Sequence, residues 1–444
     1  MDIEVTYMNR LFLAAIFTLI LSAGVSAQTD DIREFTIDTV DVSGFQPTPV
    51  GVDDMRYIGT QYITADDSAY MRYVTTVVRR DLDFYADFKL VPLDSFFLKT
   101  YEITELDLLG WKRLGADYVV KLEAEFPGSN LRVRWRLFDV LHSQRIAQGQ
   151  FEYNRTFWRI MGHDIANEIV RTLTGNAGIF RTRVAYIKKI GDAKELFISD
   201  YDGANEHQLT NNHSLNLSPA FNPKKEEIYF TSYVDGRPSL YRVDINTDKM
   251  TKVAEYGELV SAPSVSPDGN KLACVISRGG NSDIYVLDLK GDIIKRLTSR
   301  PSIESSPTWS PDSRYIAFSS DITGMPQIYV MDADGINTRR LTYQGGYNDS
   351  PVWSMRGDRI TLVSRTGTGR FNLVSIDTSG ADYRVLTDLG TNENPHFSPD
   401  GKQIIFSSTR LGGIDIYTMD VNGRNQRRLT QTGNCSNPAW GPIR

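Results

Sequence analysis

The residues Ser306-Pro307-Thr308-Trp309-Ser310-Pro311-Asp312-Ser313 open a phrase that returns along the second half of the chain. In each copy a proline follows Ser, Ala or Asn and precedes Phe, Val or Trp by two positions; these prolines are Pro219, Pro263, Pro307, Pro351, Pro395 and Pro438. Their spacings are 44, 44, 44, 44 and 43 residues. A second marker keeps the same period, namely the pair Leu-Thr that begins at Leu209, Leu297, Leu341, Leu386 and Leu429, with Val253 in its place once. Two markers with one period identify a structural repeat.

Each repeat contains four short runs with the composition of β-strands. In the copy that begins at Ser306 the runs are 307–310, 315–319, 327–331 and 338–341. The turns between them carry Pro-Asp-Ser or Asp-Gly, residues that set or tolerate the backbone angles of tight turns. Four antiparallel strands in every 40 to 45 residues are typical of a β-propeller blade.

The two ends of the repeat region predict how many blades there are and how the ring closes. Five full units begin at the first five prolines, and the last phrase, Asn437 to Trp440, supplies only a first strand. Residues 182–210 contain three strands without a first. The fragments complete each other, so we expect a six-bladed propeller closed by the C-terminal strand, with no open sheet edge.

The first half of the chain lacks the period and predicts a separate α/β domain. We expect helices from the N-cap candidates Asp66, Asp67 and Ser68 to about Tyr85, over 102–114 and over 157–173, and strands over 116–126, 131–140 and 145–154. Arg10, an apolar run over 11–21 and Val25-Ser26-Ala27 have the order of a secretory signal peptide. The predicted organisation is a signal peptide over 1–27, an α/β N-terminal domain over 28–177 and a propeller over 178–444. Either Met1 or Met8 is the initiating methionine.

The composition excludes several classes of protein. With 49 Lys and Arg against 55 Asp and Glu the net charge is −6, so there is no basic field for nucleic acid. Residues 28–177 carry 17 basic and 23 acidic residues, whereas the propeller carries 31 and 30. The acidity therefore belongs to the small domain. Two cysteines, Cys274 in a strand and Cys435 in an inter-blade loop, are two blades apart, and we do not expect a disulfide.

Catalytic and metal-binding signatures are missing from the sequence. There is no G-x-S-x-G, H-E-x-x-H, P-loop or C-x-x-C. His396 takes a slot that Ala, Ser, Thr or Val fills in other repeats, so we interpret it as a packing residue. An aspartate ends the third strand of each repeat, at Asp200, Asp244, Asp288, Asp332, Asp377 and Asp420. These carboxylates are expected to bond the backbone of the following turn. We therefore predict no enzyme, no cofactor and no metal site.

The loops between repeats are the candidate binding surface. The chain segments 211–217, 255–261, 300–305, 343–349, 388–393 and 431–436 link an outer strand to the next inner strand and are longer than the turns at the other end. Long loops on a rigid scaffold commonly carry binding residues. Among their residues, Leu259, Tyr347 and Asn392 are candidates.

At the level of family, the chain resembles TolB of the Tol-Pal system. The likeness covers nearly the whole chain after the signal peptide. It rests on the junction Gly178-Ile179-Phe180-Arg181-Thr182-Arg183-Val184-Ala185-Tyr186, on 111–117 and Gly162-His163 in the small domain, on the repeated Ser-Pro-Asp-Gly phrases and on the final Pro438-Ala439-Trp440.

The resemblance implies a non-catalytic periplasmic adaptor with two protein partners. The propeller mouth would bind the lipoprotein Pal, which places the protein peripherally at the outer membrane, and the mature N-terminus would bind TolA. Carried onto this chain, Pal-facing positions fall at Leu259, Glu304 and Ser305, with Tyr347 and Asn392 added from the loops. Leu259 stands where the family has a histidine. The TolA segment would be Glu34, Phe35, Thr36, Ile37 and Asp38, an extended acidic stretch that can add to a sheet edge.

Such an adaptor would support outer-membrane integrity and constriction during cell division, and we expect a monomer. Two other classes remain open on the residues alone. A periplasmic propeller enzyme, such as a lyase or a peptidase accessory, would need ionisable groups that converge in the channel. A carbohydrate-binding module would need exposed aromatic rings at the mouth.

Overall fold

The computed structural model describes residues 46–92, 105–365, 367 and 369–443. The predicted signal peptide and the predicted TolA segment, Glu34 to Asp38, lie outside these residues, as does the start of the helix expected from residue 102. In the described part of the chain no helix is long and apolar enough to cross a membrane.

The small domain is built on a six-stranded mixed sheet. Its strand order is β3 (Phe88–Leu90), β1 (Thr48–Val52), β4 (Tyr118–Glu125), β5 (Asn130–Asp139), β6 (Gln144–Asn154), with β2 (Arg56–Tyr57) beside β4. β1 is parallel to β3 and β4, whereas β5 and β6 are antiparallel. The sequence predicted β4 to β6 but not the three shorter strands. β1 contains Pro49 and Gly51, which weaken a local strand signal, and it is held by partners far away in the sequence.

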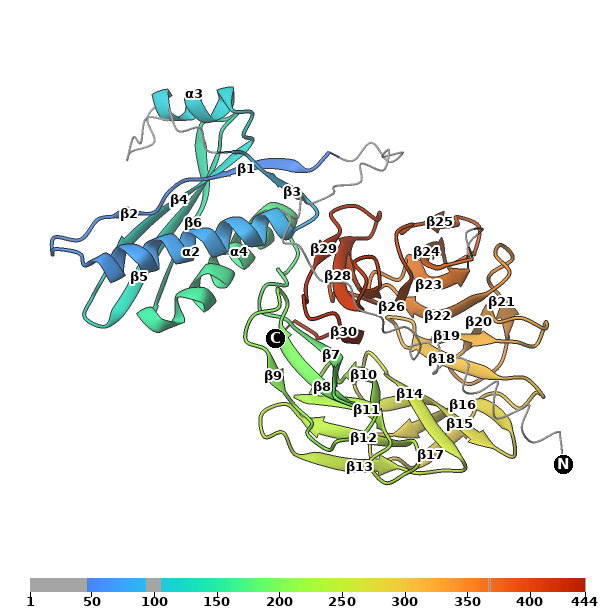
Figure 1. Cartoon of the computed structure of the whole chain (residues 1–444). Helices are drawn as coiled ribbons and strands as arrows, with labels where there is room; N and C mark the ends of the chain where they lie inside the picture. Colours follow the sequence, from blue (N-terminus) through green and yellow to red (C-terminus); the bar gives the residue numbers. More distant parts are fainter. Residues whose placement is uncertain (1–45, 93–104, 366, 368, 444) are drawn as a thin grey trace. The chain divides into compact units, whose positions relative to one another are not determined.

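Helices cover both faces of this sheet. α2 (Ala65–Phe84) and α4 (Trp158–Thr174) lie side by side on one face, as Figure 1 shows. They approach closely at Gly162, where an added Cβ would lie 2.6 Å from Cγ1 of Val77. On the other face α3 (Glu105–Arg113) packs Trp111 against Gly51, where a Cβ would meet the ring at 2.3 Å. A short 3-10 turn, η1 (Arg155–Phe157), precedes α4.

The predicted N-cap of α2 was wrong, because even the nearest candidate, Asp66, lies two positions after the observed cap. Thr64 is the cap: its Oγ1 accepts from the backbone N–H of Asp67 at 3.1 Å, and the Asp67 carboxylate accepts from the backbone N–H of Thr64 at 3.0 Å. This is a reciprocal capping box in which aspartate replaces the usual glutamate. Asp66, Asp67 and Ser68 are the second to fourth helical residues instead.

The second half is a six-bladed β-propeller, as predicted. Five blades are continuous in sequence, and Figure 1 shows the sheets arranged around one axis. The strands of these blades are β10 (Asn216–Phe221), β11 (Glu227–Ser232), β12 (Ser239–Asp244), β13 (Met250–Ala254); β14 (Leu259–Val265), β15 (Lys271–Arg278), β16 (Asn281–Asp288), β17 (Ile293–Arg296); β18 (Glu304–Trp309), β19 (Tyr315–Ser320), β20 (Gln327–Asp332), β21 (Arg339–Arg340); β22 (Asn348–Trp353), β23 (Arg359–Arg365), β24 (Phe371–Asp377), β25 (Arg384–Val385); β26 (Asn392–Phe397), β27 (Gln403–Ser408), β28 (Asp415–Asp420), β29 (Arg427–Arg428).

The sixth blade joins the two ends of the repeat region. Its order is β30 (Cys435–Trp440), β7 (Arg183–Ile190), β8 (Ala193–Asp200), β9 (His207–Gln208). β30 pairs antiparallel with β7, and Nε1 of Trp440 donates to Oγ1 of Thr182 at 2.9 Å. This is the closure that the sequence predicts, and it leaves no unpaired inner edge.

Every first strand of a blade carries a β-bulge at the residue before its proline. The six residues have φ between +49° and +54°; they are Ser218, Ala262, Ser306, Ser350, Asn394 and Asn437. The register shifts across the same position in each blade. A residue before proline normally avoids compact conformations, so this repeated left-handed residue is held by the ladder on both sides. The bulge explains why the proline phrase is so regular.

The aspartates that end the third strands bond their turns in two ways. Asp244, Asp288 and Asp377 accept from the turn backbone, as expected. Asp200, Asp332 and Asp420 instead accept from the side-chain amides of Asn205, Asn337 and Asn425. The carboxylate of Asp244 accepts from the backbone N–H of Asn246 and of Thr247, both at 3.0 Å. That of Asp288 accepts from Lys290 and Asp292. Asp420 differs because it is buried, with 4% of its surface exposed. Burial, reinforced by Asp87, raises the pKa of Asp420 from its ordinary value to about 7, against the opposing effects of Asn425 and Arg427.

A pH dependence follows for Asp420. Because its pKa is raised in the folded state, its contribution to stability is complete below about pH 4 and is lost as the pH rises through about 7. Asp420→Asn keeps an acceptor for the turn and removes this titration. We expect the variant to gain stability over wild type between pH 4 and pH 8, by up to about 4 kcal/mol since one pKa unit corresponds to about 1.4 kcal/mol. Urea unfolding of both proteins across that range measures the difference.

Asp244→Asn is the matched control because the hydrogen bond from Thr247 lowers the pKa of Asp244. That variant should lose stability relative to wild type as the pH rises to the ordinary carboxyl pKa of about 4, which is the opposite sign, and the difference should stay constant at higher pH. Parallel pH profiles for the two variants would contradict the assignment.

A buried polar cluster connects α2 and α4 with the turn that follows β8. The carboxylate of Asp81 lies 2.7 Å from Nδ1 of His163 and accepts the hydroxyl of Tyr201. All three side chains are almost fully buried. Burial raises the pKa of Asp81, although both partners oppose this. The rings of Phe84 and Phe180 pack beside the cluster, with their centroids 5.1 and 5.5 Å from that of Tyr201. Polar and apolar contacts therefore share one core.

Candidate docking surface

The mouth of the propeller is formed by two kinds of loop. We define it as the loops from the fourth strand of one blade to the first strand of the next, together with those from the second to the third strand of a blade. Parallel bridges tie the first kind to the neighbouring third strand; they are Lys194 to Leu215, Ser282 to Ile303 and Ile414 to Asn434. Three of the inter-blade loops are therefore anchored to the preceding blade.

The mouth exposes large apolar side chains. Eight loop residues of the mouth are exposed by more than a third, namely Leu215, Val234, Ile303, Ile322, Met325, Tyr343, Leu389 and Leu411. Among the residues described, the turns at the opposite end expose only Ile336, Met355 and Ile443 in this class. Exposed apolar side chains gathered on one face mark an interaction surface.

The opposite end of the propeller contacts the small domain. Lys402 pairs with Asp87, Arg427 pairs with Asp83 at 3.0 Å, and the side-chain amide of Gln403 donates to the carbonyl of Phe84. These propeller residues all lie in or beside turns of the non-mouth end. The apolar residues of the mouth take no part in these contacts.

A repeated polar network explains the Leu-Thr marker. In five blades the threonine hydroxyl accepts a backbone N–H from the first half of the third strand, at 2.8 to 2.9 Å; the threonines are Thr210, Thr298, Thr342, Thr387 and Thr430. The same hydroxyl contacts the side chain of the residue that precedes this N–H in the strand, for example Gln327 or Asp415. The network continues into the next blade, where Asn348 donates to Gln327 at 3.0 Å.

Glu304 and Asn392 belong to this network and not to the exposed surface. Each occupies the start of a first strand, 44 residues from Asn348, and they are 2% and 0% exposed. Glu304 accepts the hydroxyls of Ser302 and Ser320, and Asn392 donates to Asn372 at 3.1 Å. Burial raises the pKa of Glu304, although these hydroxyls oppose it. Their expected role as direct partner contacts does not fit this burial, since both side chains hold adjacent blades together.

A sequence signal for this role was present. Asn216, Asn348 and Asn392 recur at one phase of the 44-residue period. Glu304 falls at the same phase, so alignment along the repeat places it with the structural asparagines.

The other three predicted mouth residues are partly buried. Leu259 begins β14 and packs against the core that contains Ile284 and Trp309. Ser305 lies opposite Ser319 in the ladder. Tyr347 precedes β22; its hydroxyl donates to Asp349 at 3.1 Å and its ring lies 5.3 Å from Phe371. Burial, followed by the charge of Asp349, raises the pKa of Tyr347. The structure thus places these residues at blade junctions, beneath the exposed apolar loops.

His396 and the cysteines have packing roles. Nδ1 of His396 lies 3.0 Å from the carbonyl oxygen of Phe397 and 3.3 Å from the backbone nitrogen of Trp440, and burial lowers the pKa of this histidine. Cys274 and Cys435 are buried free thiols, so no disulfide joins them. Cys435 is the first residue of β30 and not a loop thiol as expected. Within the described residues no group of three or more His, Cys, Asp or Glu side chains is arranged to hold a metal ion.

An α/β domain followed by a closed six-bladed propeller defines a class of two-domain propeller proteins. The model of the TolB beta propeller domain matches residues 170–444, and the TolB amino-terminal domain matches residues 38–146. The chain belongs to the TolB family.

Relatives and solved structures agree with this assignment. A Tol-Pal system protein TolB from Rickettsia akari is 30% identical over 255 residues, and one from Gluconobacter oxydans is 37% identical over 177 residues. These matches cover 55% and 39% of this chain, and 56% and 39% of the relatives. The matched part of the chain thus spans between about two fifths and little more than half the length of these curated relatives. The crystal structure of TolB from Acinetobacter baumannii superposes with a TM-score of 0.78 at 26% identity, covering 90% of this chain and 97% of that one.

Proposed function

We propose that this protein is a periplasmic adaptor of the Tol-Pal system that binds the lipoprotein Pal through the propeller mouth and TolA through its mature N-terminus. The family assignment supports the system, and the eight exposed apolar side chains of the mouth carry the docking role. Such an adaptor acts by holding two partners and needs no catalytic group.

The mouth suits a folded protein partner. Stable interfaces bury about 800 Å² on each side around a few apolar anchors. The anchors here stand on loops that are hydrogen-bonded to a closed ring, so little conformational entropy is lost when a partner docks. The neighbouring polar network keeps the loops at fixed heights above the blades.

The alternatives are less well supported by the mouth. A carbohydrate-binding surface needs exposed aromatic rings, and Tyr343 is the one aromatic residue among the eight. Three carboxylates lie in the first strands that the structure describes, those of Glu304, Asp349 and Glu393. Glu304 and Asp349 accept hydrogen bonds from serine or tyrosine hydroxyls, whereas burial and the charge of Asp349 raise the pKa of Glu393. The two hydrogen-bonded carboxylates are poorly disposed for acid-base catalysis.

Charge placed in the mouth tests the Pal-binding role. In Ile303→Glu the exposed apolar anchor is replaced by a carboxylate, and we expect Pal to bind at least tenfold more weakly because a charge would be desolvated in the interface. Titration of purified Pal into the mature chain, followed by calorimetry, measures this. Ile336→Glu is the matched control: Ile336 is exposed by 55%, in a turn of the opposite end. Equal losses of Pal affinity in both variants, or no loss in either, would contradict the assignment of Pal binding to the mouth.

Deletion of residues 28–38 tests the second partner in the same preparations. Loss of TolA capture with Pal binding retained is the expected result. Loss of both partners with an unchanged melting temperature would contradict separate sites.

A further inference from the structure

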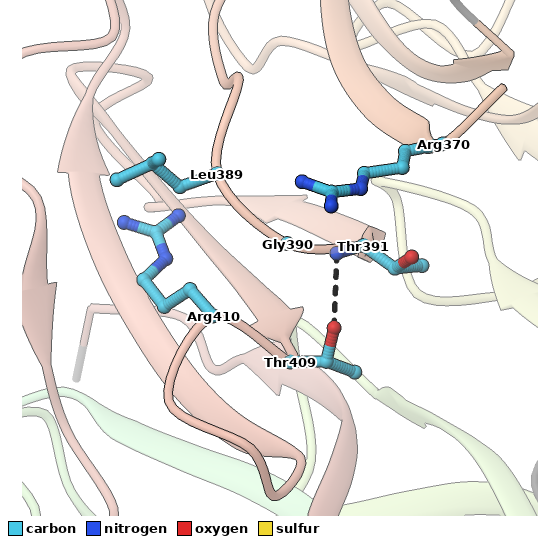
Figure 2. A pocket seen from close by; sticks show the side chains of 6 residues that line it. All are labelled: Arg370, Leu389, Gly390, Thr391, Thr409 and Arg410. Atoms are coloured by element: carbon cyan, nitrogen blue, oxygen red, sulfur yellow. Dashed lines mark hydrogen bonds between the residues drawn. The ribbon is translucent and has the colours of Figure 1, made fainter. Parts of the chain in front are cut away.

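A pocket of about 400 Å³ opens on the mouth between two consecutive blades. Its lining consists of Arg370 before β24, of Leu389, Gly390 and Thr391 before β26, and of Thr409 and Arg410 after β27. Figure 2 shows the two arginines on opposite sides of the segment 389–391. The backbone N–H of Thr391 donates to Oγ1 of Thr409 at 2.9 Å and fixes this segment.

The guanidinium of Arg410 is held in place but its charge is not neutralised. It donates to Oγ of Ser408 at 2.9 Å, to Oδ1 of Asn392 at 3.1 Å and to Oε1 of Gln426, all neutral acceptors. It also lies 4.5 Å from the ring centroid of Tyr417. In the part of the chain that the structure describes, no carboxylate forms an ion pair with it. Burial lowers the pKa of Arg410, although Tyr417 and Asp388 oppose this, so an added anion would stabilise the charge.

The surroundings of the pocket are cationic and partly apolar. Arg370 is exposed and has no acceptor among the described residues, and Arg365 lies in the same loop with its Nε bonded to the carbonyl of Gly369 at 3.2 Å. Among the described residues, Asp388 directly precedes the lining segment and Glu393 follows it by two positions. Leu389 is 45% exposed at the rim. Three cations against two carboxylates leave a net positive charge, which favours an anionic ligand with an apolar neighbour.

Gly390 lets the lining segment lie directly against the backbone of Arg410. Its φ is +70°, and an added Cβ would lie 2.7 Å from the backbone nitrogen of Arg410. The backbone of 389–391 therefore passes against the segment 409–410, which follows β27, without a side chain between them.

We propose that this pocket binds a carboxylate of an acidic protein segment, between Arg370 and Arg410, with an adjacent apolar side chain against Leu389. Guanidinium groups match the planar geometry of a carboxylate and bind it with two parallel hydrogen bonds. A protein segment fits better than a free anion because the pocket opens among the apolar side chains of the mouth. The inference deepens the proposed docking function and rests on it, but its test requires no Pal.

The probe is a fluorescent pentapeptide Glu-Leu-Glu-Leu-Glu, with Gln-Leu-Gln-Leu-Gln as its uncharged match. Fluorescence anisotropy with the mature chain should show binding of the acidic peptide alone, weaker by about tenfold or more when salt is raised from about 50 mM to about 500 mM. In Arg370→Gln the affinity should fall by about tenfold. Arg300→Gln, an exposed arginine in another loop of the mouth, should stay within about twofold of wild type.

Arg370 is exposed and forms no hydrogen bond or ion pair with the residues that the structure describes, so we expect Arg370→Gln to fold like wild type. Arg410→Lys is the second variant: it keeps the charge but cannot bind a carboxylate in the bidentate manner, and it should bind the peptide more weakly than wild type. Equal affinity of Arg370→Gln and wild type, or of the acidic and uncharged peptides, would overturn the proposal. Displacement by phosphate and acetate at millimolar concentration would reveal a simple anion site and overturn the assignment to a protein segment. Pal binding that survives in Arg370→Gln leaves the docking function intact.

Discussion

Deletion of Asn437 to Arg444 is expected to produce the largest loss of stability in this protein. The deletion removes most of β30, whose ladder with β7 closes the ring, and it removes Trp440, whose indole bonds Thr182 and whose ring lies 6.4 Å from that of Phe84. Truncation of a buried tryptophan alone typically costs about 3 to 5 kcal/mol. Loss of β30 would also leave the edge of β7 without a partner strand. We expect the melting temperature to fall by more than about 10 °C, or a chain that aggregates.

The matched control is removal of Ile443 and Arg444 alone. Ile443 is 40% exposed, and the last backbone bond to β7, from Gly441 to the carbonyl of Arg183 at 2.7 Å, is kept. Differential scanning calorimetry of both truncations measures the effect. Similar melting temperatures for the two truncations would refute closure by β30.

Asp81→Ala is expected to have the second largest effect. The substitution leaves the Tyr201 hydroxyl and the His163 ring buried without their shared acceptor. An unsatisfied buried polar group costs about 1 to 3 kcal/mol, so the loss should be about 3 kcal/mol or more. Urea unfolding monitored by tryptophan fluorescence measures it.

Two variants keep this result interpretable. Asp83 lies two residues after Asp81 on the same helix and forms an exposed ion pair with Arg427. Asp83→Ala removes this pair and should cost less than about 1 kcal/mol. Tyr201→Phe removes a single hydroxyl and should cost an intermediate amount. If Asp81→Ala and Asp83→Ala are equally stable, the buried cluster does not support the fold.

The roles of Glu304 and Asn392 show where reasoning from single loops fails. Both residues lie in loop-like polar sequence, and their burial depends on the threonine and polar side chains of the preceding blade, which are 5 to 20 residues away. The position of a residue within its loop gives no information about that contact. Its position within the 44-residue repeat does give that information, because equivalent residues of a propeller meet equivalent neighbours.

No pattern in the sequence predicted the pocket beside Arg410. Arg370, Leu389 and Arg410 come from three segments with no shared motif, and they meet because consecutive blades place their mouth loops side by side. The short strand β1 escaped prediction for a related reason, since its parallel neighbours β3 and β4 lie about 40 and 70 residues later. Non-local pairing leaves little trace in local composition.

The sequence by itself determined the ring. A 44-residue period, turn residues at fixed offsets and complementary end fragments specify six blades and their closure, because each repeat must bury its faces against the next. The tertiary structure alone decided which mouth residues reach solvent, that burial raises the pKa of Asp420, and that two arginines share one pocket. Those properties depend on what lies against each side chain, and that is set by packing between blades and domains and not by the repeat pattern.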